Sequence, residues 1–228
     1  MPSQERDEQK GLPLPRVRLG DEVYDQLVSR LLSHQLAPGD RITVDALSRE
    51  LGVSQTPIRE ALTRMEAGGV VVRTHLAGYR VAPELDRRSF DDLVELRLLL
   101  EPVAAQHAAE RTTPEQLDAL RELASAMEAQ ESGPDGTQDY AAFAGLDARF
   151  HDAVAEAAGS ALLREALARL HTHLKLFRLS SGRRVLTEAL AEHRAVVDAV
   201  AAGDPDAAAA AMREHVERSA ARFSAFFS

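Results

Sequence analysis

The sequence predicts a mainly α-helical protein in two parts: three helices with a small β-hairpin, followed by an all-helical antiparallel bundle. Hydrophobic residues make up 45 % of the 228 residues but aromatic residues only 4 %, which favours an alanine-rich helical protein. Apolar residues recur at helical spacing along most of the chain. The exception is VVVRTHLAGYRVA (70–82), where β-branched residues flank a Gly-containing turn.

The net charge of −9 is distributed unevenly along the chain. Residues 1–83 carry 11 Lys and Arg against 11 Asp and Glu, whereas residues 84–228 carry 16 against 25. The second part therefore holds the entire net negative charge. Within 41–83, six arginines face four acidic residues, and phosphate binding depends on where cations lie rather than on their total. We expect two domains with different partners.

Composition also indicates the domain boundaries. Residues 1–20 mix charges with prolines and are predicted to form a flexible arm, 21–83 form the first domain, and 84–228 the second. The chain has no apolar run of the ~20 residues needed to cross a bilayer, and the arm lacks the apolar centre of a signal peptide. The absence of cysteine excludes disulfides and thiolate metal sites. We expect a cytoplasmic protein with no membrane partner.

The first domain is predicted to contain three helices and the hairpin. Residues 21–36 place four apolar side chains on one face and end at the turn APGD, and 44–51 form a shorter helix closed by Gly52. The third helix lies within VSQTPIREALTRMEAGG. Ser54 is its expected N-cap, with a hydroxyl that accepts from the free N–H groups of the first turn. Pro57 lies in that turn, where a missing N–H costs nothing.

This order of elements is that of a winged helix-turn-helix, whose third helix enters the major groove of DNA with its N-terminal residues against base edges. The polar N-terminal end of the third helix suits that task, because it offers donors and acceptors from Ser54, Gln55, Thr56 and Arg59. On the hairpin, Arg73 and His75 could reach the DNA backbone or the minor groove. A structural interpretation is open for each residue, in which Ser54 is only a cap and the arginines are solvated.

The second domain is predicted to be a helical bundle. Thr113 and Gln116 have capping-box spacing around Pro114, and Gly159 and Gly203 stop helices. The predicted helices cover 87–110, 114–130, 138–158, 160–180, 184–202 and 205–225.

One set of residues in the bundle has the composition of a metal site. Asp147 and His151 are four residues apart in LDARFHDAV, so both lie on one helical face. On residues alone, such a pair is more often a surface hydrogen bond than a metal site. His193 and His215 each lie among apolar residues on separate later helices, and neither has an obvious role as core filler.

The run PGDRITVDALSRELGVSQTPIREALTRMEAGGVVVRTHLAGYRV closely resembles the DNA-binding domain of GntR-type bacterial transcription regulators, with LGVSxTPxREAL as its most specific part. The remaining chain resembles the FadR-like subgroup, whose C-terminal part is an all-helical ligand-binding domain. The resemblance implies that Gln55, Thr56 and Arg59 contact bases or phosphates and that Arg49 contacts a phosphate. It also implies that His75 and Gly78 belong to the tip of the wing.

Three departures from the family pattern affect the operator sequence rather than DNA binding itself. The family commonly has Arg where Gln55 stands and Glu where Val44 stands. Its wing often contains Asn-Arg-Gly, whereas this chain has Leu-Ala-Gly at 76–78.

The resemblance also implies a metal and an effector. Asp147, His151, His193 and His215 match, one by one, the Asp and three His that bind a divalent metal in many FadR-like domains. Imidazole with carboxylate suits Zn²⁺, Ni²⁺ or Mn²⁺ and does not select among them, and Zn²⁺ is the ion that we expect. An open coordination position would accept water or a carboxylate.

Arg97 and Arg149 are the candidate residues for binding an anionic effector. Arg97 lies one turn before Glu101, which by itself indicates an ion pair. The resemblance implies instead that Arg97 points into a cavity, where its guanidinium could bind a carboxylate bidentately. For Arg149, a solvated helix face is the simpler interpretation.

Together these observations predict a homodimeric regulator, commonly a repressor in this family, that binds a palindromic operator in double-stranded DNA and senses a small organic acid. Two alternatives are open. The chain could be a metal hydrolase or lyase using Asp147 and the three histidines, although no further residue stands out as a general base. It could also be a DNA-binding protein whose metal is structural or is itself the signal.

Overall fold

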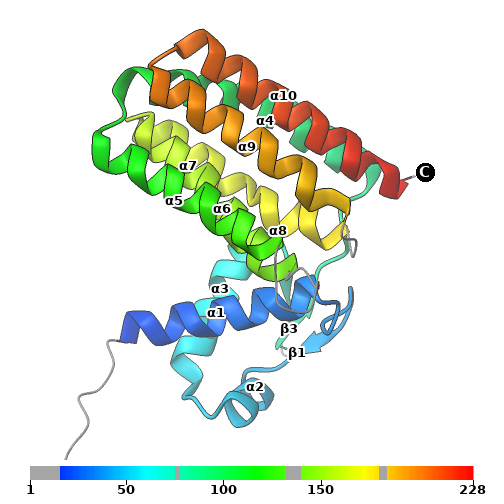
Figure 1. Cartoon of the computed structure of the whole chain (residues 1–228). Coiled ribbons are helices and arrows are strands. Elements are labelled where there is room, and N and C mark those ends of the chain that lie inside the picture. Colours follow the sequence, from blue (N-terminus) through cyan, green and yellow to red (C-terminus); the bar gives the residue numbers. More distant parts are fainter. Residues whose placement is uncertain (1–15, 75–77, 132–139, 180–183, 228) are drawn as a thin grey trace, which may run out of the picture.

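The computed structural model describes residues 16–74, 78–131, 140–179 and 184–227. Figure 1 shows two parts, the helical bundle above and the smaller domain with α1, α2, α3 and the strands below. No helix in the described ranges is long and apolar enough to cross a lipid bilayer.

The smaller domain is a winged helix-turn-helix with its own hydrophobic core. Its helices are α1 (Arg16–Leu32), α2 (Val44–Leu51) and α3 (Gln55–Ala67), and its strands are β1 (Arg41–Ile42), β2 (Val71–Thr74) and β3 (Gly78–Val81). α1 packs on α3, and α2 also packs on α3. Leu27, Ile58, Leu62 and Met65 are completely buried, as the helical spacing predicts.

The wing is a three-stranded antiparallel sheet with strand order β1-β3-β2. The hairpin of β2 and β3 confirms the prediction, whereas the two-residue strand β1 was not predicted. Its pairing with β3 brings Ile42 so close to Gly78 that a Cβ at Gly78 would lie 2.8 Å from the Ile42 carbonyl oxygen. Gly78 also has φ +88, so glycine is required there on both grounds.

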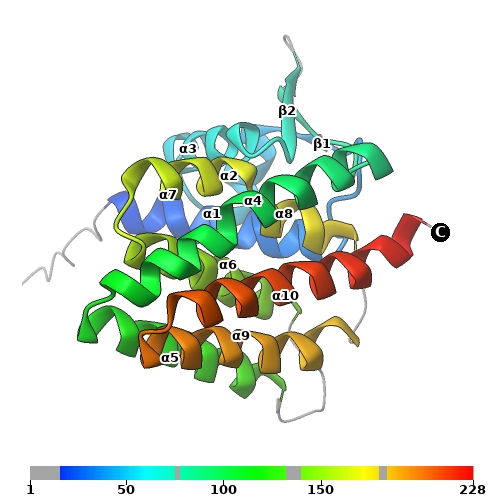
Figure 2. The ribbon, with the colours of Figure 1, turned by 90° about the horizontal axis from the view of Figure 1, so that it is seen from above.

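The larger domain is the predicted helical bundle, which Figure 2 shows from above. α10 packs along α4 and α9, and α5 packs against α6 and α9. The capping box before α5 is confirmed, because Thr113 Oγ1 accepts from Gln116 N and Gln116 Oε1 accepts from Thr113 N. The helices are α4 (Arg87–Arg111), α5 (Pro114–Glu131), α6 (Tyr140–Ala157), α7 (Ala161–Leu170), α8 (Thr172–Leu176), α9 (Arg184–Ala202) and α10 (Pro205–Ser224), with short 3₁₀ turns η1 (Phe177–Leu179) and η2 (Ala225–Phe227).

Three local predictions differ from the structure. The single helix predicted over 160–180 is divided into α7, α8 and η1, because His171 adopts a left-handed conformation with φ 48°. The first helix runs over Arg16–Leu32 rather than 21–36, since it extends into a segment without an apolar stripe. Ser54 is the N-cap of α3, but its side chain accepts no capping hydrogen bond.

The two domains share an interface. The buried Arg178 of η1 donates a 2.6 Å hydrogen bond from Nη2 to the carbonyl of Ala82, in the linker between the domains. α1 packs against α6. The Gly68 position at the end of α3 lies against the His171 ring, where a Cβ would be 3.2 Å from Cγ. The end of the third helix is therefore in contact with the bundle.

Candidate metal centre and DNA-binding surface

The N-terminal end of α3 is an exposed polar surface. Gln55, Thr56 and Arg59 are exposed, as the sequence predicts for residues that meet DNA, and Ser54 is exposed beside them. Pro57 and Ile58, in contrast, are buried and hold the helix on its domain. The surface is thus carried on a fixed helix with its polar side chains in solvent.

Two of these side chains belong to a hydrogen-bonded chain that begins on α2. Gln55 Nε2 donates to Asp45 Oδ1 at 2.6 Å, and Arg59 Nη2 donates to Gln55 Oε1 at 3.1 Å. Arg49 Nε donates to the backbone carbonyl of Asp45 at 3.3 Å. The predicted residues Arg49, Gln55 and Arg59 therefore lie together on one face formed by α2 and α3.

The wing carries the remaining residues that are predicted to contact DNA. Arg73 on β2 is exposed, and Gly78 begins β3. His75 lies outside the described residues.

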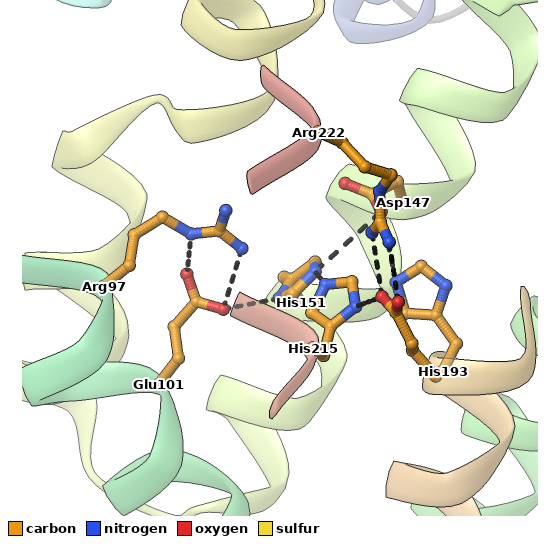
Figure 3. Close-up of polar contacts among 8 residues, drawn as sticks. Arg97, Glu101, Asp147, His151, His193, His215 and Arg222 are labelled. Atoms are coloured by element: carbon orange, nitrogen blue, oxygen red, sulfur yellow. Dashed lines mark hydrogen bonds and ion pairs between the residues drawn. The ribbon is translucent and has the colours of Figure 1, made fainter. Parts of the chain in front are cut away.

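The four predicted metal ligands converge in the bundle, although they come from three helices. Asp147 and His151 lie on α6, His193 on α9 and His215 on α10. One donor atom from each lies within 4.8 Å of every other, and Figure 3 shows the side chains pointing toward one another. His193 is completely buried and His215 is 3 % exposed. Asp147 and His215 are far apart in the sequence, and the packing of the three helices brings them together.

The spacing of the donors fits a metal ion. His215 Nε2 lies 3.2 Å from His151 Nε2, and Asp147 Oδ1 lies 3.1 Å from His193 Nε2 and 3.9 Å from His151 Nε2. Ligands about 2.1 Å from a zinc ion are separated from each other by about 3.0–3.4 Å. The pairs at 3.1 and 3.2 Å already have this separation, whereas Asp147 and His151 at 3.9 Å would have to move closer around an ion.

A buried carboxylate orients His151. Glu101 Oε2 lies 2.8 Å from His151 Nδ1, and Glu101 also binds Arg97, whose Nε donates to Oε1 at 2.6 Å and whose Nη2 donates to Oε2 at 3.3 Å. Burial by itself would raise the pKa of the Glu101 carboxyl, but Arg97 and His151 hold it well below its usual range. Glu101 therefore stays ionised and directs the Nε2 of His151 toward the other ligands.

A second buried carboxylate has the same relation to His215. Glu192 Oε2 lies 2.9 Å from His215 Nδ1. Arg222 Nη1 and Nη2 donate to the two Glu192 oxygens at 2.6 and 2.8 Å. Burial opposes ionisation, yet Arg222 and His215 lower the pKa of Glu192 to about 2. With Nδ1 facing a carboxylate, the His215 ring presents its Nε2 lone pair to the cluster.

Two of the three imidazoles favour the neutral form that binds metal. Burial lowers the pKa of His193, and burial together with neighbouring His193 lowers the pKa of His215 to about 3. Burial alone would lower the pKa of His151 as well, but the Glu101 carboxylate beside it raises that pKa above its usual value. A neutral ring with its Nδ1 proton on a carboxylate has an unprotonated Nε2. The Nε2 atoms of His151 and His215 face each other at 3.2 Å, so their lone pairs would repel unless a cation or a proton lies between them.

A cavity of about 350 Å³ adjoins this cluster and reaches the DNA-binding domain. From the bundle, His151 and Glu101 line it; from the smaller domain, Tyr24, Arg64 and Ala67 line it. Arg64 lies in the last turn of α3, with its guanidinium 4.0 Å from the centre of the Tyr24 ring. One cavity therefore borders both a candidate metal ligand and the end of the third helix.

The two predicted effector residues occupy different places. Arg97 is buried and borders a void of only about 10 Å³ that Asp147 and His215 also line. Arg149 is exposed and borders a separate cavity of about 690 Å³, which Asp25 of α1 also lines. The structure thus does not bring Arg97 and Arg149 together.

Some residues of both sites were missed at the level of sequence. Glu192 and Arg222 hold His215, and Asp45 holds Gln55. Glu192 directly precedes His193 in an apolar stretch, which is a weak signal, but nothing in the sequence pairs it with Arg222. The ion pair of Arg97 with Glu101 was foreseen, whereas the contact of Glu101 with His151 was not.

Comparison with known proteins agrees with this architecture. Residues 19–81 match the model of the bacterial regulatory proteins of the gntR family, and residues 92–218 match that of the FCD domain. The chain belongs to the GntR family. Within it, the FCD domain places the chain in the FadR-like subgroup. A GntR-family protein of this kind is a DNA-binding transcription regulator with an effector-binding domain, and not an enzyme.

Similar proteins include regulators named for the operons they are thought to control and a regulator of solved structure. The chain is 30 % identical to a probable D-xylose utilization operon transcriptional repressor of Paenarthrobacter nicotinovorans, over 89 % of this chain and 88 % of that protein. It is 29 % identical to a putative L-lactate dehydrogenase operon regulatory protein of Escherichia coli, over 89 % and 85 %. The structure of E. coli McbR/YncC superposes with a TM-score of 0.73 at 25 % identity, covering 92 % of this chain and 99 % of that one.

Proposed function

We propose that this GntR-family regulator is a homodimeric repressor that binds a palindromic operator and whose DNA affinity is set by a small carboxylate bound at a metal in the FCD domain. The observation that carries the proposal is the cavity shared by His151 and the end of α3. A ligand there would contact the metal-binding cluster and the DNA-binding domain at once. The relative from P. nicotinovorans, described as a probable repressor, supports the direction of the effect.

Asp147, His151, His193 and His215 would hold the metal. Zn²⁺ is the proposed ion, and Ni²⁺ or Mn²⁺, which the same ligands suit, are the alternatives. When bound, the ion supplies a Lewis-acidic position for an anionic ligand. Glu101 and Glu192 fix the rings of His151 and His215, so the site is formed before the metal arrives.

The effector is proposed to be a small organic acid. The cavity of about 350 Å³ is within the range of small-molecule sites, and it is mostly apolar with a few polar groups. His151 lies on its metal side and Arg64 on the opposite domain. We keep Arg97 as a candidate effector residue, since it borders the void beside Asp147, and Arg149 as a candidate at the neighbouring cavity.

The ligand can control DNA binding only if it binds two domain arrangements with different affinity. The shared cavity provides such a difference, because any movement of α3 relative to the bundle changes its wall at Arg64 and Ala67. A difference of about 1.4 kcal/mol between the arrangements would change the operator dissociation constant tenfold.

On the DNA side, α3 is proposed to enter the major groove. Its N-terminal side chains would meet base edges and the wing would meet the backbone or minor groove. The assigned residues are Arg49, Ser54, Gln55, Thr56, Arg59, Arg73, His75 and Gly78.

A second copy of this chain is the proposed partner for an exposed apolar stripe on α4. Leu96, Leu99 and Val103 are 43 %, 60 % and 40 % exposed, and their spacing places them on one side of the helix. A palindromic operator requires two such chains related by a two-fold axis. Sedimentation of the wild-type protein and of Leu99→Lys tests this: a dimer that dissociates in the variant supports the assignment.

Fluorescence anisotropy against the DNA upstream of the chain's own gene tests the central proposal, with an unrelated duplex as competitor. Specific binding that weakens steeply with salt is expected, because phosphate contacts release counterions. Arg59→Ala should reduce specific affinity about ten- to a hundredfold. Arg121→Ala, an exposed arginine of the bundle, is the charge-matched control.

The same assay distinguishes the roles of metal and acid. A panel of small carboxylates added to the zinc-loaded protein should include one that releases DNA. If chelation changes DNA affinity but no carboxylate does, the metal is structural or is the signal. If DNA binding is independent of sequence and nearly independent of salt, the regulator proposal itself fails.

A further inference from the structure

The hydrogen-bonded chain on the DNA-binding face carries a consequence for sequence specificity. Asp45 accepts from Gln55, and Gln55 accepts from Arg59. We propose that Asp45 is a specificity-determining residue, which acts by fixing the amide of Gln55 so that it reads adenine. This inference rests on the proposed recognition of DNA by Gln55 and Arg59.

The orientation of a glutamine amide decides which edge donates and which accepts. A free amide can rotate by half a turn and exchange its NH₂ and its oxygen. Gln55 lies between two groups that each allow one role: the Asp45 carboxylate only accepts, and the Arg59 guanidinium only donates. The only amide orientation compatible with both neighbours has Nε2 toward Asp45 and Oε1 toward Arg59.

The remaining hydrogen-bonding capacity of Gln55 matches one base. One of the two Nε2 protons is used by Asp45, and one of the two Oε1 lone pairs by Arg59. A donor and an acceptor are left side by side, and this pair is complementary to N7 and the N6 amino group of adenine. The Arg59 guanidinium keeps further N–H groups for a guanine or a phosphate in the next position.

Asp45 is suited to this role by its place on α2. It lies in the first turn of that helix, where the N-cap Thr43 fixes the chain and a carboxylate is favoured by the helix dipole. Its carboxylate is exposed, so removing it leaves no unpaired group in the core. A negative charge on a DNA-binding face also repels phosphates, and its presence there costs non-specific affinity.

In Asp45→Ala we therefore expect non-specific DNA affinity to rise while discrimination between bases falls. Asp45→Ala should bind unrelated DNA more tightly, because a repulsive charge is gone. It should discriminate less at one base pair in each half-site, by about tenfold, since the bidentate contact to that base is no longer held in place. Asp45→Asn keeps an oxygen that can accept from Gln55 and should retain most of the discrimination.

Selection from a random duplex library by the full-length protein, followed by anisotropy on single-base variants of the selected site, tests the inference without a known operator. Glu50→Ala is the matched control, because it removes the same charge from α2 at an exposed pair with Arg30. It should raise non-specific affinity while leaving every base preference unchanged. Asp45→Ala and Asp45→Asn are compared with it after their helical content is checked by circular dichroism.

A double-variant comparison separates positioning from direct contact. If Asp45 acts through Gln55, Asp45→Ala should cause no further loss of base preference in a Gln55→Ala background. A further loss at another base pair would overturn the inference, as would unchanged preferences in Asp45→Ala alone. Failure of the wild-type protein to select any motif would overturn the proposed function and this inference together, which distinguishes the two.

Discussion

The bundle and the winged domain both contain chains of interacting polar side chains, but the side chains are buried in the bundle and exposed on the winged domain. Around the metal-binding cluster, Arg97, Glu101 and Glu192 are at most 5 % exposed. On the DNA-binding face, Asp45, Gln55 and Arg59 are all exposed. In the bundle the packing of helices fixes the polar geometry in advance and leaves these groups little exposed surface. On the winged domain the final geometry depends on DNA, which must exclude the water itself.

This difference has consequences for stability. A buried charge that loses its partner keeps its desolvation cost, whereas an exposed one is solvated by water. Substitutions in the bundle should therefore be measured mainly as lost folding free energy. Substitutions on the DNA-binding face should change binding with little effect on folding.

The largest expected loss of folding free energy comes from breaking the ion pair of Glu192 with Arg222. Glu192→Ala leaves the guanidinium of Arg222 with only an exposed partner, and should lower the free energy of unfolding by about 3 kcal/mol. Urea denaturation followed by circular dichroism measures this. Glu188 also approaches Arg222, at 3.6 Å, but is 70 % exposed, so Glu188→Ala is the control and should cost less than about 1 kcal/mol. Equal losses in the two variants would remove the contrast between buried and exposed pairs.

Metal binding should produce the next largest effect, and only in the bundle. Free Zn²⁺ at a hundred times its dissociation constant should stabilise the protein by about 2.7 kcal/mol, because only the folded chain presents the four ligands together. His193→Ala should lose this stabilisation and its bound metal. His34→Ala, at an exposed histidine outside the cluster, should keep both. Metal content of one ion per chain in His193→Ala would contradict the assigned ligand set.

Features that depend on neighbouring residues could be predicted from the sequence, whereas features that depend on helix packing could not. The start of α5 was predictable because capping is local. Its capping donors and acceptors lie on Thr113 and Gln116, three residues apart. The four metal ligands were identified through resemblance, since Asp147 and His215 come together only by packing of three helices. Nothing local pairs Glu192 with Arg222, thirty residues apart.

Two errors have equally physical origins. The break at His171 could not be seen from helical periodicity, because the apolar pattern continues through α7 and α8 while the ring contacts Gly68 in another domain. The strand β1 is only two residues long and depends on pairing with β3. Both features are set by contacts that are distant in sequence.

The smallest expected change in stability comes from replacing the N-cap residues of the two helices of the helix-turn-helix. Ser54, the N-cap that the sequence predicts, precedes α3, and Thr43 is the N-cap of α2 in the structure. Only Thr43 makes the bond, with Oγ1 accepting from Ala46 N at 3.3 Å. Thr43→Ala should therefore lower the free energy of unfolding by about 1 kcal/mol.

Ser54→Ala should change the free energy of unfolding by less than about 0.5 kcal/mol, because no capping bond is lost. Its effect should instead be on the operator affinity, since the exposed hydroxyl lies at the end of α3 proposed to face DNA. Parallel urea titrations and anisotropy measurements of the two variants separate these outcomes. A loss of stability in Ser54→Ala equal to that in Thr43→Ala would make Ser54 a structural cap. Its hydroxyl would then belong with the groups whose geometry is fixed before DNA is bound.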